Sequence, residues 1–73
     1  MVAKSEFNDR VNAVEPEKAS VLVVAIKLPT GALEIITNYQ NIPEKIKYYQ
    51  ENYNENMRLK HAPDVQIVNF MIV

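Results

Sequence analysis

His61 is the residue of this chain best suited to proton transfer near neutral pH, and it lies within residues 58–64. A catalytic histidine needs an orienting partner and usually a nucleophile within hydrogen-bonding distance. Asp64 follows across a proline, which is weak support for such a pair, and a solvated loop histidine is the simpler interpretation. Glu51 and Glu55 share a predicted helix face, where exposed glutamates are ordinary. We therefore expect no catalytic residues and no enzymatic activity.

Metal and cofactor sites are not expected either. The sequence has no cysteine and one histidine, which leaves no thiolate site and too few nitrogen ligands for zinc. Its only glycine, Gly31, cannot build a glycine-rich loop around a phosphate. Binding of a macromolecule is the remaining class of function.

The tyrosines are candidate binding residues. Tyr49 and Tyr53 fall on the inward stripe of a predicted helix, where packing in the core is the simpler interpretation. Tyr39 and Tyr48 fall off that stripe, and exposed tyrosine is enriched in recognition surfaces. Together with Lys45 they are our candidate contacts to a partner.

Three basic residues, Arg58, Lys60 and His61, follow the predicted helix. Positive charge there complements the helix dipole, and contact with a phosphate is the functional alternative. Eight basic and nine acidic residues give a net charge of −1, whereas DNA-coating proteins carry a basic excess. Nucleic acid is thus not the expected partner. A nucleic-acid-associated accessory protein, using this basic patch with Lys45, is the alternative function.

The clearest predicted element is a β-hairpin. Residues 21–26 form a continuous, mostly β-branched apolar run, which predicts a strand covered on both faces. Residues 28–31 contain a proline and the glycine of a turn. Residues 32–37 form the second strand, in which side chains alternate between two faces: Leu33, Ile35 and Thr37 on one, Glu34, Ile36 and Asn38 on the other.

A helix and a third strand complete the predicted sheet. Asn41 and Glu44 suggest an N-cap and its capping-box partner for a helix over residues 43–57. The inward stripe of this helix is Ile46, Tyr49, Tyr53 and Met57. Residues 65–73 form a strand that is apolar on both faces: Val65, Ile67 and Met71 alternate with Val68, Phe70 and Ile72.

We therefore predict an α+β domain over residues 20–73, in ββαβ order, with a three-stranded, mainly antiparallel sheet and one packed helix. The first strand is placed between the other two. Residues 1–19 are predicted to be an arm or a short helix, because Phe7, Val11 and Val14 form a weak helical stripe that Pro16 ends.

One helix covers only one face of such a sheet. A domain of 73 residues buries a thin core, and without cysteine it cannot be stabilised by disulfides. An apolar face of several hundred Å² rarely stays exposed on a soluble monomer. We therefore expect a homo-oligomer, a dimer or larger. The predicted interface residues are Val21, Val23, Val68, Phe70 and Ile72.

Residues 27–38 (KLPTGALEIITN) and 65–73 (VQIVNFMIV) resemble segments of small uncharacterised proteins encoded by phages of Gram-positive bacteria. The similarity covers residues 20–73 and carries no motif with assigned chemistry. It implies a short accessory protein that acts on a host or phage protein in the host cytoplasm. The lack of cysteine and of a long apolar run also fits a soluble cytoplasmic protein.

Overall fold

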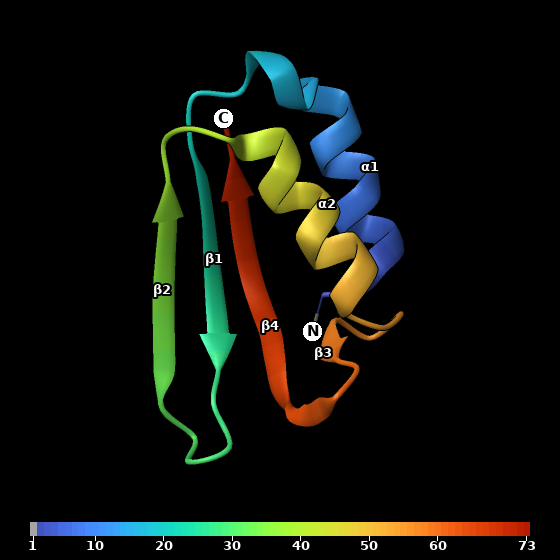
Figure 1. Cartoon of the computed structure of the whole chain (residues 1–73), viewed down its shortest axis with the longest axis vertical. Helices are drawn as coiled ribbons and strands as arrows, with labels where there is room; N and C mark the ends of the chain where they lie inside the picture. The colour runs from blue at the N-terminus through green and yellow to red at the C-terminus, as the bar shows by residue number, and fades with distance from the viewer. Residues whose placement is uncertain (1) are drawn as a thin grey trace.

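The computed structural model describes residues 2–73; Met1, the first residue of the predicted segment 1–19, lies outside the described residues. The elements, in chain order, are helix α1 (Lys4–Val14), the 3-10 turn η1 (Pro16–Lys18), strands β1 (Leu22–Lys27) and β2 (Leu33–Asn38), helix α2 (Ile42–Asn52), and strands β3 (Arg58–Leu59) and β4 (Ala62–Ile72) (Figure 1). The predicted α+β class is confirmed. The described residues form four strands and two helices, so the expectation of three strands was incomplete.

The strands form one antiparallel sheet in the order β2-β1-β4-β3. As predicted, β1 lies in the middle and pairs with β2 on one side and β4 on the other. β2 and β4 consequently run parallel to each other, with α2 in the connection between them. β3, which the sequence did not predict, pairs with β4 at the far edge.

The β1–β2 hairpin closes where the sequence predicts it. The Gly31 amide donates to the Leu28 carbonyl at 2.8 Å, and the Leu28 amide donates to the Ala32 carbonyl at 2.8 Å. Gly31 has a φ of 90°, a left-handed conformation that glycine adopts at little cost. A turn followed by a left-handed glycine is a common three-residue hairpin loop, and it fixes the register of the two strands.

Helix α1 forms within residues 1–19, for which the sequence predicted either an arm or a short helix. Phe7 and Val11, from the predicted stripe, are fully buried, and Val14 is half-buried against the core. The helix ends at Val14 because Glu15 has a φ of 62° and Pro16 cannot continue it. α1 thus packs into the same core as residues 20–73, and the predicted boundary at residue 20 does not separate two packing units.

Helix α2 is shorter than predicted. It ends at Asn52, although Tyr53 and Met57 are buried as the inward stripe required. The Asn54 side-chain oxygen accepts hydrogen bonds from the backbone amides of Asn56 and Arg58, at 2.9 and 3.1 Å. Such local bonding competes with helical hydrogen bonds and turns the chain back toward the sheet.

The predicted N-cap of α2 is wrong. Asn41 has a left-handed backbone, with φ 56° and ψ 34°, and its side chain makes no capping hydrogen bond to the described residues of α2. A capping side chain requires an extended backbone at this position. Pro43 in the first turn still suits the start of the helix.

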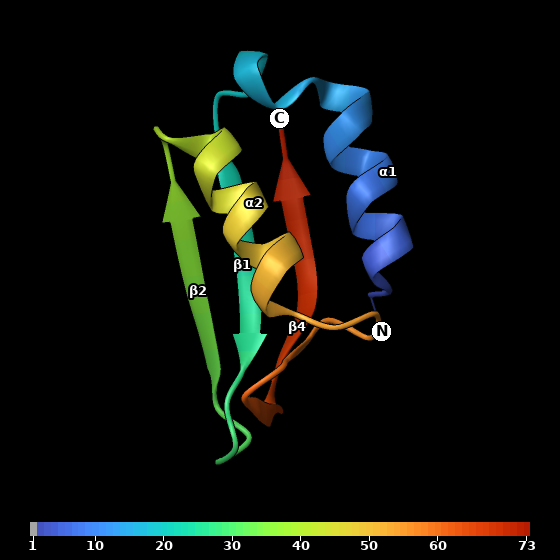
Figure 2. The ribbon, with the colours of Figure 1, turned by 45° about the vertical axis from the view of Figure 1, so that its right-hand side comes forward.

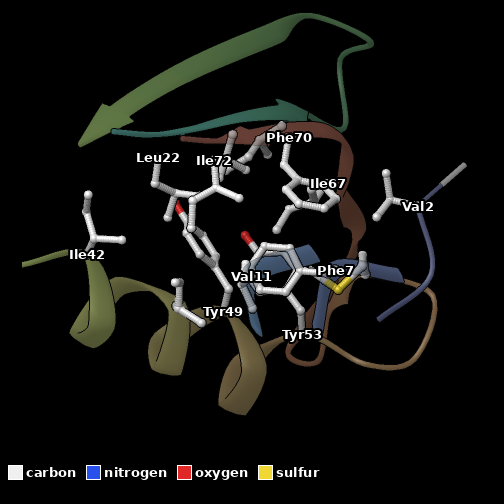
Figure 3. Close-up of a cluster of buried hydrophobic side chains, with 14 residues drawn as sticks. Val2, Phe7, Val11, Leu22, Ile42, Tyr49, Tyr53, Ile67, Phe70 and Ile72 are labelled. Carbon is white, nitrogen blue, oxygen red and sulfur yellow. The ribbon is translucent and has the colours of Figure 1, made fainter. Parts of the chain in front are cut away.

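Both helices pack on the same face of the sheet (Figure 2). Figure 3 shows the side chains of Leu22, Ile67, Phe70 and Ile72 pointing from the strands toward α1 and α2. Val23 and Ala25, which alternate with the buried residues of β1, are only half-buried. The expectation that residues 21–26 are covered on both faces is therefore wrong, because the helices cover one face.

Replacing Phe7 should destabilise the whole domain. Its ring lies 4.9 Å from that of Phe70 and 6.3 Å from that of Tyr49, so truncation leaves a cavity between α1, α2 and β4. We expect Phe7→Ala to lower the free energy of unfolding by about 3 kcal/mol or more. Urea denaturation followed by circular dichroism measures this. The exposed neighbour Glu6→Ala is the control and should change stability by less than about 0.5 kcal/mol; equal effects of the two substitutions would contradict the assignment.

Candidate interaction surface

The sheet surface opposite the helices is the largest feature without a cover, and we call it the open face. The register places side chains there in rows across the three strands. Val23 pairs with Thr37 and Met71, and Ala25 pairs with Ile35 and Asn69. Paired residues of antiparallel strands point to the same side of a sheet. The open face comprises Val21, Val23, Ala25, Leu33, Ile35, Thr37, Asn69, Met71 and Val73.

The open face is apolar and accessible. The exposed fractions are 62% for Leu33, 60% for Ile35, 46% for Met71 and 58% for Val73. Large exposed apolar groups are unremarkable singly, but clusters of them mark interaction sites. Lys27, at the hairpin end of β1, pairs with Leu33 and places a charge beside this surface. Arg58 lies in the same row across the sheet, because Gln66 pairs with both Lys27 and Arg58.

The predicted interface residues divide between the two faces. Val21 and Val23 lie on the open face and are half-buried. Phe70 and Ile72 are buried in the core beneath the helices, opposite Val24 and Leu22, and cannot form a surface of the folded chain. Their assignment to an interface is corrected.

Val68, the remaining predicted interface residue, marks the point where the predicted alternation of side chains along the last strand fails. β1 pairs Ala25 with Asn69 and then Ile26 with Ile67, so Val68 is an additional residue in β4 without a partner in β1. A bulge of this kind reverses which alternate residues face the core. Ile67 is therefore buried on the same side as Phe70, although strict alternation predicted opposite faces.

The large exposed apolar residues of the open face were all missed as interface candidates: Leu33, Ile35, Met71 and Val73. The alternation of Leu33 and Ile35 in the second strand was visible in the sequence and is confirmed by the register. The sequence did not indicate on which face of the sheet the helices pack. That choice depends on contacts between segments far apart in the chain.

The predicted partner contacts lie elsewhere. Tyr39 is highly exposed in the loop after β2, and Tyr48 is exposed on α2. Lys45 places its ammonium 5.5 Å from the centre of the Tyr48 ring, a cation–π arrangement. Tyr48 also stacks edge-on against Tyr49 at 5.4 Å, so its ring is held by contacts within the chain.

The basic residues near β3 are only partly free. The Arg58 guanidinium donates to the Pro63 carbonyl at 2.9 Å, whereas Lys60 and His61 are exposed in the turn before β4. Lys4, from the start of the chain, adds to this group of basic residues. Burial and the nearby charge of Lys60 lower the pKa of Lys4, and Glu55 has a smaller, opposing effect. The Lys4 ammonium is occupied, because it donates to the Gln50 carbonyl at 2.6 Å.

The described residues hold no group of three or more histidine, aspartate or glutamate side chains arranged to bind a metal. One surface hollow, about 550 Å³, is lined by Lys4, Asn54, Glu55, Asn56 and Lys60. Another, about 470 Å³, lies between the helices and η1 and is lined by Glu15, Glu17, Pro43 and Ile46 among others. In the part of the chain that the structure describes, no helix is long and apolar enough to cross a membrane.

Comparison of the chain with protein-family models, curated proteins and solved structures returned no match. The resemblance to phage proteins therefore stays a prediction, and any function must be argued from the surface itself.

The buried tyrosines should make the protein less stable at high pH. Burial, with smaller effects from Tyr53 and Tyr48, raises the pKa of Tyr49 from 10.0 to about 12. The unfolded chain therefore releases this proton first as the pH rises. Stability should be unaffected below about pH 10 and fall by on the order of 2 kcal/mol between about pH 10 and 12.

Urea denaturation at a series of alkaline pH values measures this loss. Tyr49→Phe should reduce the pH dependence, although Tyr53, whose pKa burial also raises, keeps part of it. The exposed Tyr39→Phe is the control and should behave as the wild type. A Tyr49→Phe variant with an unchanged pH dependence would rule out this cause.

Proposed function

We propose that the protein is a small, non-enzymatic protein–protein interaction module that self-associates through the open face of its sheet. The exposure of Leu33, Ile35, Met71 and Val73 on one side of three adjacent strands is the observation that carries this proposal. Two copies stacked face to face would remove these side chains from water, as sheets do within a β-sandwich.

The size of the open face supports a specific but modest interface. Its four most exposed side chains present on the order of 400 Å², which is the size of the largest apolar patch on a typical monomer. With the half-buried residues between them, two copies would bury on the order of 1,000 Å² in total, near the lower limit of specific interfaces. We therefore expect a dimer whose population depends on protein concentration.

The composition of the face favours a second copy as its occupant. Thr37 and Asn69 are uncharged, and Lys27 lies at the hairpin end, so two copies can stack without burying opposed charges. A host or phage protein is the other occupant, as the sequence resemblance implies.

Nucleic-acid binding through Arg58, Lys60 and Lys45 is less well supported. The net charge is −1, and two of these three side chains already contact groups of the same chain. Single-stranded nucleic acid stacks on exposed aromatic rings, and the open face has none.

The substitution Met71→Glu should prevent association through the open face. A carboxylate within the stacked faces would be buried without a partner, which should weaken the dimer about 100-fold or more. Sedimentation or light scattering over a wide concentration range measures the dissociation constant. Tyr48→Glu is the matched control, because Tyr48 and Met71 are equally exposed, at 46%, and lie on opposite sides of the molecule.

The proposal requires a wild type that associates, a Met71→Glu variant with a smaller mass than the wild type at the same concentration and an unchanged circular dichroism spectrum, and a Tyr48→Glu variant with the wild-type mass. A wild type that stays monomeric at every concentration contradicts it. Salt-dependent binding of a labelled oligonucleotide, lost in Arg58→Ala, would instead support the nucleic-acid alternative.

A further inference from the structure

A second surface, distinct from the open face, is the outer edge of β2. β2 is the terminal strand of the sheet, and Figures 1 and 2 show none of residues 2–73 beyond it. The opposite edge is different, because it is formed by β3, which is only 2 residues long. β3 pairs only with Ala62 and Gln66, so the rest of the outer edge of β4 has no strand partner either. That edge is irregular, however, because β4 contains a bulge and the Asn69 side-chain oxygen accepts a hydrogen bond from the Phe70 amide. β2 therefore provides the regular unpaired edge of the sheet formed by residues 2–73.

The hairpin fixes which backbone groups of β2 point outward. The hydrogen bond from Leu28 to Ala32 begins the ladder, so Glu34 and Ile36 are bonded to β1. Hydrogen-bonded and non-bonded pairs alternate along an antiparallel ladder. The amides and carbonyls of Leu33, Ile35 and Thr37 consequently point away from the sheet.

This edge lacks the features that usually protect an edge strand. Its sequence, LEIITN, contains no proline and no lysine, and its pairing with β1 has no bulge, in contrast to the pairing of β4. Glu34 is its one charged residue. Long, regular, apolar edges of this kind are templates for pairing with another strand.

We propose that a second copy pairs its β2 with this edge, antiparallel and centred on Ile35. In that register Ile35 faces its counterpart, and Leu33 faces Thr37 of the second copy. All outward amides and carbonyls of the three residues are then bonded, as when a strand is added to a sheet. The two sheets become one continuous sheet of eight strands.

Charge and symmetry favour a second copy over a foreign strand. The two-fold arrangement places Glu34 opposite Ile36 of the second copy, so the two carboxylates do not face each other directly. A contact of this type uses the same residues on both chains and closes on itself. It also brings Leu33 and Ile35 of one copy beside those of the other.

The edge interface goes beyond the proposed function, because it does not involve Met71. Two single-cysteine variants test it, Glu34→Cys and Ile36→Cys, since the chain has no cysteine of its own. Both are made in the Met71→Glu background, in which stacking of the open faces is blocked. Directly opposed residues of a non-hydrogen-bonded antiparallel pair lie close enough for a disulfide.

Under mild oxidation, an equal mixture of the two variants should form the disulfide-linked dimer about fivefold more than either variant alone. Adding Thr37→Pro to both should remove the cross-link, because proline blocks an outward amide without breaking the pairing with β1. No cross-link in the mixture, or equal cross-linking of each variant alone, would overturn the edge interface. These results are separate from the proposed function, which is decided by whether Met71→Glu lowers the mass relative to the wild type.

Discussion

The contact of Phe7 with Phe70 and Tyr49 joins the first helix, the second helix and the last strand in one aromatic cluster. Both helices contribute a ring to this cluster, and both therefore lie on one face of the sheet. Residues 2–73 contain no further helix to place on the other side. The accessible apolar surface of β1, β2 and β4 is a direct result of how the core is built.

Local chemistry in the sequence predicted the parts of the fold that depend on neighbouring residues. The turn at Gly31, the alternation in β2 and the central position of β1 agree with the structure. The end of α2 was misplaced because the Asn54 side-chain oxygen accepts hydrogen bonds from nearby amides and replaces helical bonds. Helix α1 gave only a weak signal, because it buries just Phe7 and Val11 and owes its order to tertiary packing.

The sequence predicted that one face of the sheet would be uncovered, but it identified only some of the residues on that face. An uncovered sheet face followed from the small number of helices, and Val21 and Val23 do lie on it. Phe70 and Ile72 were misassigned because an almost continuous apolar strand gives no indication of its buried side. The additional residue Val68 then reversed the alternation within β4, and no feature of the sequence marks that position as a bulge.

The position of β4 has a consequence for how the protein is made. A ribosome delivers α1, β1 and β2 before β4, yet β4 supplies one side of the ladder of β1 and the ring that packs on Phe7. The hairpin can form early because its contacts are local, whereas α1 cannot dock until Phe70 has emerged. The apolar residues of β1 therefore stay incompletely covered until β4 has been synthesised.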